Sequence, residues 1–313
     1  MPGRWLAPRP AVPLQKTPGE FREGALAEPS KQAASVTVAL TAMTLVAFAS
    51  NSLLCRTALV GGSIDPASFT SLRIISGATT LWSISAFFRR RSRPSGSWIS
   101  AAMLALYAIA FSYAYVRLST ATGALILMGS VQATMIVAGI RAGERLAPRQ
   151  WLGLLVALGG TTYLVFPGIT APPVFGSLLM VTAGIAWGIY SLRGRGSNDP
   201  ITATTDNFIR AVPIAVVLVL VQRNEAGWST YGILLAIVSG SLTSGMGYVL
   251  WYTALRGLTA TRAAIVQLGV PILAAAGGVM LLSEVITPRL VVASIAVVAG
   301  VGVAVTGRVR TRG

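Results

Sequence analysis

Residues 258–307 read LTATRAAIVQLGVPILAAAGGVMLLSEVITPRLVVASIAVVAGVGVAVTG, and the order of features in this stretch occurs twice in the chain. The earlier copy begins at Leu118 with LSTATGALILMGSVQ. The matching positions are Thr120, Ala121, Thr122, Ala124, Ile126 and Val131 with Thr259, Ala260, Thr261, Ala263, Ile265 and Val270, then Glu144, Pro148, Arg149 and Gly160 with Glu284, Pro288, Arg289 and Gly300. Internal similarity at a near-constant offset indicates two copies of one unit.

The composition around these copies is that of a membrane protein. Of the 313 residues, 54% are hydrophobic and only 11% are charged, with a mean hydropathy of +0.70, whereas soluble domains carry about 25% charged residues. Apolar runs long enough to cross a bilayer recur along the chain, and continuously apolar runs favour helices over alternating barrel strands. We therefore predict an all-α polytopic membrane protein of about ten transmembrane helices, near 35–55, 66–88, 98–117, 119–140, 149–167, 174–192, 201–221, 230–254, 259–281 and 290–307.

The positive charge lies in the joints between these runs. A net charge of +16 is compatible with nucleic-acid binding, but most of the Lys and Arg residues fall in alternate joints, which is typical of the cytoplasmic side of a membrane. We therefore expect the lipid bilayer and no nucleic acid as partner, and both termini in the cytoplasm, in an inner or plasma membrane. Residues 1–34, rich in proline and mixed charge, are expected to form a disordered cytoplasmic tail, and 308–313 a basic cytoplasmic end.

Cysteine and histidine are nearly absent. The chain has one cysteine, Cys55, and no histidine, which excludes an intrachain disulfide and makes His-based metal sites or triads impossible. We expect no cofactor, no metal and no enzymatic activity. A monomer is sufficient for a substrate path within one chain.

The repeat extends beyond the opening stretch. Asp65-Pro66 followed by Arg73 is echoed by Asp199-Pro200 followed by Arg210. The offset of roughly 134 to 140 residues corresponds to about five spans. Because five is odd, the second copy enters the membrane from the other side, so we predict two inverted five-helix repeats, 35–167 and 168–307.

These motifs resemble the EamA family of the drug/metabolite transporter superfamily over roughly residues 36–307. The motifs are Pro66-Ala67-Ser68-Phe69 before Arg73, Gly143-Glu144-Arg145-Leu146 before Pro148 and Gly153, Ala186-Trp187-Gly188, Thr261-Arg262-Ala263-Ala264 before Pro271, and Ser283-Glu284 before Pro288. The resemblance implies a ten-helix carrier but no particular substrate. Two positions depart from the pattern: Gln132 stands where the second copy has Pro271, and Ser283 replaces an expected glycine.

Charged residues within the spans are the first candidates for ligand contact. Arg73 costs at least ~2.5 kcal/mol at the centre of a span, and its guanidinium suits a substrate carboxylate; the alternative is an arginine that holds helix-end carbonyls. Arg210 has Asp206 one turn earlier, where an i,i+4 ion pair is expected. Asp206 is therefore a possible proton-coupling group or a purely structural one. Glu144 and Glu284 are interpreted as capping groups at helix joints.

Polar amides and aromatic side chains complete the predicted substrate-binding site. Amides near mid-span either orient a polar ligand or bond between helices, and aromatic stripes either line a cavity or pack in the core. The predicted residues are Asn51, Gln132 and Gln267, together with Tyr107, Phe111, Trp187, Tyr190, Tyr248, Trp251 and Tyr252.

The predicted function is secondary transport of a small polar metabolite by alternating access. An amino acid or related compound is the expected cargo and export the expected direction. One alternative is a carrier of nucleobases, vitamins or other ring-containing metabolites, in which the aromatic residues stack on the ring. An alternative of another class is a membrane sensor or partner protein without transport.

Overall fold

The computed structural model describes residues 31–88, 95–141, 147–166, 168, 171–194, 199–222, 228–255, 258 and 266–306. These residues form helices and short connections, with no strand among them. The helices are α1 (Lys31–Val60), α2 (Pro66–Phe87), α3 (Trp98–Tyr115), α4 (Thr120–Arg141), α5 (Pro148–Val165), α6 (Val174–Gly194), α7 (Pro200–Val221), α8 (Thr230–Val238), η1 (Ser239–Met246), α9 (Gly247–Ala254), α11 (Gly269–Leu282) and α12 (Pro288–Thr306).

Within the described part of the chain there are ten helical segments, because α8, the π-helical η1 and α9 follow one another without a break. The all-helical prediction is confirmed. Helix α1 begins at Lys31, so the structure describes the last four residues of the predicted tail 1–34 as helical. The rest of that tail, the start of the predicted span 259–281 and the basic end 308–313 lie outside the described residues.

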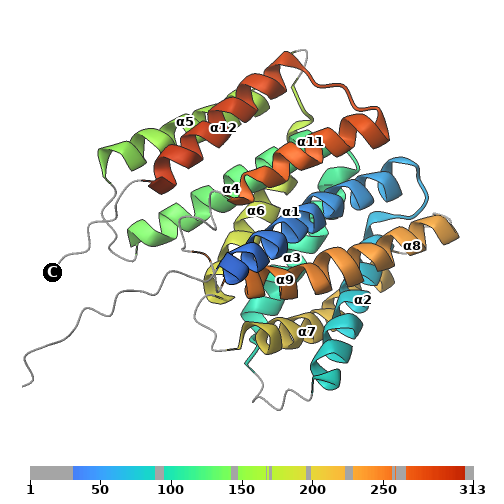
Figure 1. Cartoon of the computed structure of the whole chain (residues 1–313). Coiled ribbons are helices and arrows are strands. Elements are labelled where there is room, and N and C mark those ends of the chain that lie inside the picture. Colours follow the sequence, from blue (N-terminus) through green and yellow to red (C-terminus); the bar gives the residue numbers. More distant parts are fainter. Residues whose placement is uncertain are drawn as a thin grey trace, which may run out of the picture.

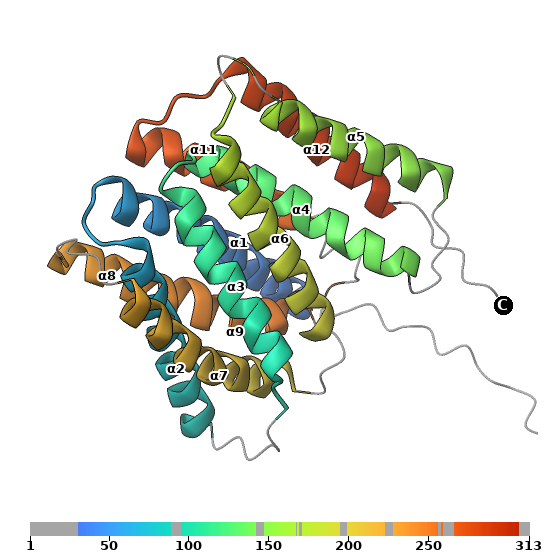
Figure 2. The ribbon, with the colours of Figure 1, turned by 180° about the vertical axis from the view of Figure 1, so that it is seen from behind.

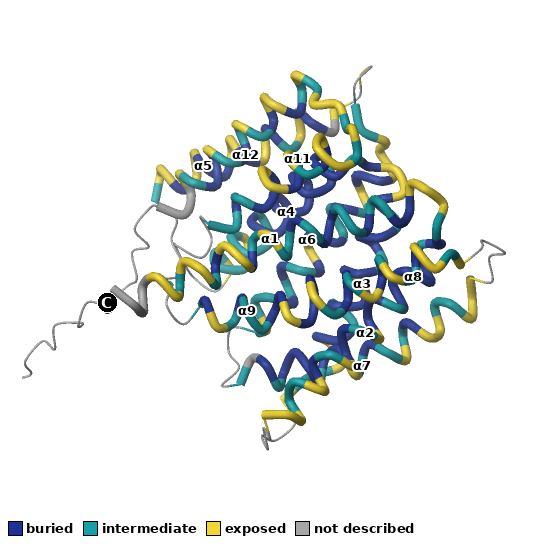
Figure 3. Tube along the Cα trace, turned by 45° about the vertical axis from the view of Figure 1, so that its right-hand side comes forward, coloured by how far each residue is buried: buried dark blue, intermediate teal, exposed yellow. Residues whose placement is uncertain are grey.

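Six of the described helices are long and apolar enough to cross a membrane. Two more apolar helices are shorter, Gly269–Leu282 and Pro288–Val303. Helix α2 is not among the six, since it carries a polar buried face that includes Ser68, Thr70, Ser71 and Arg73. Figure 3 shows exposed stretches along the outer helices. Large apolar side chains are exposed on these helices, such as Leu155, Val217, Leu220, Leu234 and Ile295. A surface of this kind faces lipid rather than water.

Most of the large interfaces join a helix of the first half of the chain to one of the second half. Helix α5 packs along α12 at one side of the molecule, α2 along α7 at the other, and α3, α4 and α6 lie between them (Figures 1 and 2). The pairs α3 with α6 and α4 with α6 have the counterparts α9 with α1 and α11 with α1. The two halves therefore correspond helix by helix, with α1 to α5 matching α6, α7, the segment α8–η1–α9, α11 and α12 in that order, and this exchange maps the interfaces onto one another.

Close contacts between helices depend on glycine at two places in the bundle. Gly184 and Gly188 of α6 lie against Ser130 and Thr134 of α4, with no room for a Cβ atom. The G-x-x-x-G spacing therefore lets these helices approach closely. In the second half, Gly240 of η1 lies so close to the backbone of Arg73 that a Cβ atom would overlap the Arg73 carbonyl oxygen. This contact fixes η1 against α2 beside the candidate site.

Candidate functional site

A small polar cavity lies in the middle of the helical bundle, between helices of both halves. It leaves only about 20 Å³ for water-sized molecules, which is room for about one water. Ligand pockets usually measure about 300–1,000 Å³, so the cavity is closed around its polar groups. It is lined by Phe48, Asn51, Ser52, Arg73, Tyr107, Phe111, Leu127, Met128, Trp187, Thr243, Ser244, Tyr248 and Val270.

Arg73 is the central charge of this cavity, and only 2% of its surface is exposed. Its Nε donates to Ser244 Oγ at 3.1 Å and its Nη2 to the Tyr107 hydroxyl at 3.2 Å. The guanidinium carbon also lies 5.3 Å and 5.0 Å from the ring centroids of Tyr107 and Phe111, within cation–π range. No described carboxylate pairs with Arg73, and its buried Nη1 has no hydrogen-bond partner in the described part of the chain.

Asn51 links the cavity wall of the first half to η1. Its Nδ2 donates to the Tyr107 hydroxyl at 3.4 Å, and its Oδ1 accepts from Ser239 Oγ at 2.7 Å and from Thr243 Oγ1 at 3.2 Å. The Tyr107 oxygen therefore accepts from both Asn51 and Arg73. Short π-helical segments are rare and often occur at functional sites, and here η1 supplies three of the hydroxyl groups of this network.

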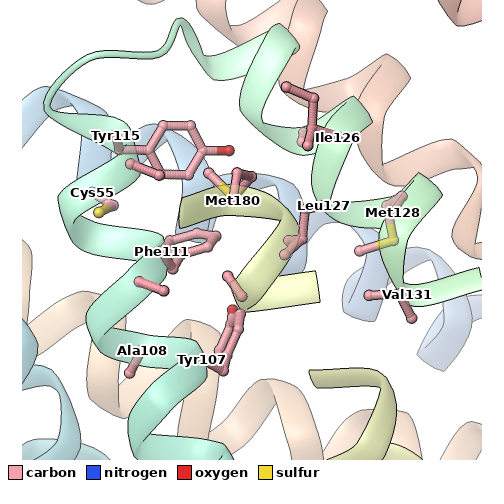
Figure 4. Packing of buried hydrophobic residues seen from close by; sticks show 14 of the residues in the cluster. Cys55, Tyr107, Ala108, Phe111, Tyr115, Ile126, Leu127, Met128, Val131 and Met180 are labelled. Atoms are coloured by element: carbon pink, nitrogen blue, oxygen red, sulfur yellow. The ribbon is translucent and has the colours of Figure 1, made fainter. Parts of the chain in front are cut away.

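Aromatic rings form the rest of the wall. The Trp187 ring centroid lies 4.9 Å from that of Tyr107, 5.0 Å from that of Tyr248 and 5.5 Å from that of Tyr190. Figure 4 shows Tyr107 and Phe111 on α3, facing the helix that carries Leu127 and Met128. The site thus combines one buried cation, one amide and several hydroxyls with a large apolar wall.

Local sequence signals explain why Arg73 reaches this position. Asp65 caps α2, with its Oδ1 accepting from the Ser68 amide at 2.9 Å, and Pro66 occupies the first turn. Helix α2 therefore begins at a fixed residue, and Arg73 follows two turns later on its buried face. Asp199 and Pro200 begin α7 in the same way, with the Thr202 amide donating to Asp199 Oδ1 at 3.2 Å.

The structure brings six of the predicted substrate-binding residues into one cavity: Asn51, Arg73, Tyr107, Phe111, Trp187 and Tyr248. Tyr190 stacks behind Trp187, and Trp251 contacts Phe48 with ring centroids 6.1 Å apart, so both lie one layer behind the cavity. Tyr252 lies further from it, where its hydroxyl is next to Gly194.

The other predicted polar residues lie elsewhere. Gln132 is buried against α5 and α12, beside a separate small cavity lined by Leu154, Ala157 and Val301. Gln267 is half-buried and helical, two residues before the start of α11, and does not line the central cavity. Asp206 Oδ2 accepts from the amides of Ser95 and Gly96 at 2.8 Å and 3.1 Å, so this carboxylate holds the segment before α3.

Several lining residues were missed by the sequence analysis: Phe48, Ser52, Leu127, Met128, Thr243, Ser244 and Val270. Four of these are apolar residues in apolar runs, and nothing in their sequence marks them as cavity residues. Thr243 and Ser244 had a usable signal, because SGSLTSG at 239–245 is a polar cluster in the middle of an apolar run. A polar cluster at membrane depth must face protein or water.

These groups can recognise a ligand through charge and hydrogen bonds. An arginine holds its charge at all physiological pH values, and the amide and hydroxyls around it are neutral donors and acceptors. Among the described residues, no group of three or more His, Cys, Asp and Glu side chains is placed to hold a metal ion. The arrangement can bind an anionic group at Arg73 and place an apolar group against Trp187 and Tyr248.

Comparisons with known proteins agree with this architecture. The model of the EamA-like transporter family matches the chain twice, over residues 35–166 and 174–306. A protein of Pseudomonas aeruginosa described as uncharacterized is 48% identical over 273 residues, which is 87% of this chain and 95% of that protein. An uncharacterized transporter of Archaeoglobus fulgidus is 25% identical over 255 residues, 77% of this chain and 87% of that protein.

A solved crystal structure shares the fold, with a TM-score of 0.61 at 19% identity, covering 87% of this chain and 96% of the other. The two family matches together span most of the chain and meet between α5 and α6, where the sequence repeat predicts the boundary. This chain is therefore a membrane transporter that belongs to the EamA-like transporter family.

Proposed function

We propose that this chain is a secondary transporter that moves a small polar metabolite, an amino acid or a related compound, in the direction of export. The observation that carries the proposal is the buried Nη1 of Arg73, which has no partner among the described residues. An uncompensated buried charge costs several kcal/mol. A substrate carboxylate in the cavity supplies the missing counter-ion and accepts hydrogen bonds from Arg73 Nη1.

The neighbouring groups fit the remainder of an amino acid. Asn51 and the hydroxyls of Thr243 and Ser244 lie beside Arg73 and suit further polar groups of the ligand. Trp187 and Tyr248 suit an apolar side chain. These groups come from both halves of the chain, as expected of a midplane site between two repeats.

Alternating access is the mechanism we propose, with two inverted repeats that move against each other. The matching interfaces of the two halves support the repeats. The cavity volume of about 20 Å³ is too small for an amino acid, which supports a cycle in which the halves separate to admit substrate and close around it. Positive charge in the joints supports a cell-membrane location with both termini cytoplasmic.

The test is flux in proteoliposomes with a panel of amino acids, with efflux measured from loaded vesicles. We expect Arg73→Lys to reduce flux at least about tenfold, since an ammonium cannot bond Ser244, Tyr107 and a carboxylate in one plane. Arg117→Lys is the matched control, because Arg117 lies outside the cavity and its guanidinium stacks on Phe175. If no amino acid moves faster than in empty vesicles, amino-acid transport is excluded.

A second cargo class is supported by the rings around Trp187, which lie about 5 Å from it. Nucleobases or vitamins would stack on such a wall. Trp187→Ala separates the two classes: a ring-containing substrate loses most of its affinity, whereas a small aliphatic amino acid keeps it. Binding without flux for every compound would instead favour the sensor alternative.

A further inference from the structure

A second and much larger hollow lies outside the central cavity, between α4, α5 and α6. It encloses about 630 Å³ and is lined along α4 from Gly129 to Arg141, by Leu158 to Thr162 of α5 and by Val181 to Leu192 of α6. Val137, Leu158 and Ile185 on its walls are 42%, 42% and 44% exposed. In a membrane protein, side chains exposed at this depth face lipid, so the hollow is a groove open to the bilayer.

The groove walls are mainly apolar, and three of their four hydroxyl residues bond within their own helix, Thr162 being the fourth. Ser130 Oγ donates to the Ile126 carbonyl at 2.8 Å, Thr134 Oγ1 to the Ser130 carbonyl at 2.7 Å, and Thr161 Oγ1 to the Ala157 carbonyl at 3.0 Å. These hydroxyls bond their own helices and present methyl and methylene groups to the groove. A polar metabolite would find few hydrogen-bond donors in the groove, whereas a hydrocarbon chain needs none.

The length and the charge of the groove identify one kind of hydrocarbon. From Gly129 to Arg141 the wall runs along twelve residues of α4, about 18 Å at 1.5 Å per residue. The hydrocarbon core of one leaflet is about 15 Å deep. Arg141, exposed in the last turn of α4, therefore lies at the headgroup level of the leaflet in which the groove runs.

We propose that the groove between α4, α5 and α6 binds one acyl chain of an anionic glycerophospholipid, whose phosphate pairs with Arg141. An empty groove of this size would leave its walls without dispersion contacts, and an acyl chain restores them. The lipid fills the space between α5 and α6. It is thus a bound partner of α4, α5 and α6 rather than a transported substrate, and the inference is independent of the cargo proposed for the central cavity.

The test is native mass spectrometry of the full chain in detergent, titrated with palmitoyl-oleoyl phosphatidylglycerol or with the matching phosphatidylcholine. The wild-type protein is expected to retain one phosphatidylglycerol molecule with an affinity about fivefold above that for phosphatidylcholine, the preference of one arginine for anionic lipid. Equal retention of the two lipids would contradict the proposal.

Three variants and one control separate the groove from the general lipid surface. Ala138→Trp and Ile185→Trp fill the groove and should abolish tight binding of both lipids. Arg141→Gln should keep one bound lipid but lose the preference for phosphatidylglycerol. Arg193→Gln removes an arginine that also lies at a helix C-terminus but outside the groove, bonded to Ser97 and Ser100, and should behave as wild type.

The melting temperatures of Ala138→Trp and Ile185→Trp in detergent show whether a loss of lipid binding comes from a filled groove or from a misfolded protein. Undiminished lipid retention by either tryptophan variant with a wild-type melting temperature would overturn the proposal. If both tryptophan variants fail to fold, the comparison of Arg141→Gln with Arg193→Gln decides: the same preference in both contradicts the proposal, and loss in Arg141→Gln alone supports it.

Discussion

The carboxylate of Glu284 accepts a hydrogen bond from the Thr120 amide at 2.9 Å and another from Thr120 Oγ1 at 3.1 Å. Glu284 lies between α11 and α12, and Thr120 is the first residue of α4, so the bond crosses from the second half of the chain to the first. Arg56 Nε is 3.5 Å from Glu284 Oε1, and Arg56 Nη1 donates to the carbonyl oxygens of Tyr115 and Val116. These contacts join α1, the end of α3 and the start of α4 to the joint between α11 and α12, and this cluster of Arg56, Thr120 and Glu284 is called the latch.

Removing the charge of Glu284 should open this latch. Hydrogen bonds to charged groups contribute about 1.5–3 kcal/mol, so Glu284→Gln should increase the open population about tenfold or more. Cys55, the only cysteine, is fully buried beside Arg56 and reports on the opening. We expect a membrane-impermeant maleimide to label Cys55 of Glu284→Gln at least about tenfold faster than that of the wild type.

Thr287→Ala is the control for the latch. Thr287 Oγ1 caps α12 through the Leu290 amide in the same joint but does not bond α4. Cys55 of Thr287→Ala should be labelled at the same rate as Cys55 of the wild type. If Glu284→Gln also labels at the wild-type rate, the bonds to Thr120 do not hold the helix ends together.

The backbone conformation of Ser283 leads us to expect that glycine at this position stabilises the protein. Its φ of 54° is in the left-handed region, and its amide and that of Glu284 both donate to the Gly278 carbonyl at the end of α11. A side chain in this conformation costs roughly 1–2 kcal/mol relative to glycine. Ser283→Gly should therefore raise the melting temperature in detergent, whereas Ser241→Gly, inside the helical η1, should lower it. A lower melting temperature for Ser283→Gly would contradict this account of the cap.

The starts of α2 and α7 could be predicted from the sequence, because aspartate and proline act through local backbone geometry. The central site was predicted in part for a similar reason. Arg73 and Asn51 are polar at membrane depth, which restricts them to the interior. The aromatic residues Tyr107 and Phe111 follow because their spacing places them on one face of α3.

Other parts depend on how helices rotate and pack, which the sequence does not display. Gln132 is as polar as Asn51, yet it lies on the α5–α12 side of α4, because the neighbours of that face are set by tertiary packing. The π-helical segment η1 places Thr243 and Ser244 at the cavity and Ser239 against Asn51, and no local signal gives its register. The reach of Glu284 to a helix 164 residues away is likewise a property of the assembled fold.

Gly240 is expected to tolerate no side chain. A Cβ atom there would overlap both Ser76 Oγ and the Arg73 carbonyl oxygen, and the second is backbone that cannot move aside alone. Gly240→Ala should force η1 from α2, with a cost of about 1–3 kcal/mol of stability and loss of the Arg73–Ser244 bond. Gly159→Ala is the control, because nothing lies within 4 Å of its added Cβ. Equal melting temperatures of the two variants would show that α2 and η1 adapt.

Asp206 separates proton coupling from structural support. Its Oδ2 accepts from two backbone amides before α3 and lies 3.8 Å from Arg210 Nη1, and it does not line the central cavity. Asp206→Asn keeps the shape but weakens the acceptor, so we expect a melting temperature a few degrees lower. The ratio of flux with an imposed pH gradient to flux without one should be the same for Asp206→Asn as for the wild type. A gradient response present in the wild type and abolished in Asp206→Asn would instead make this carboxylate the proton-coupling group.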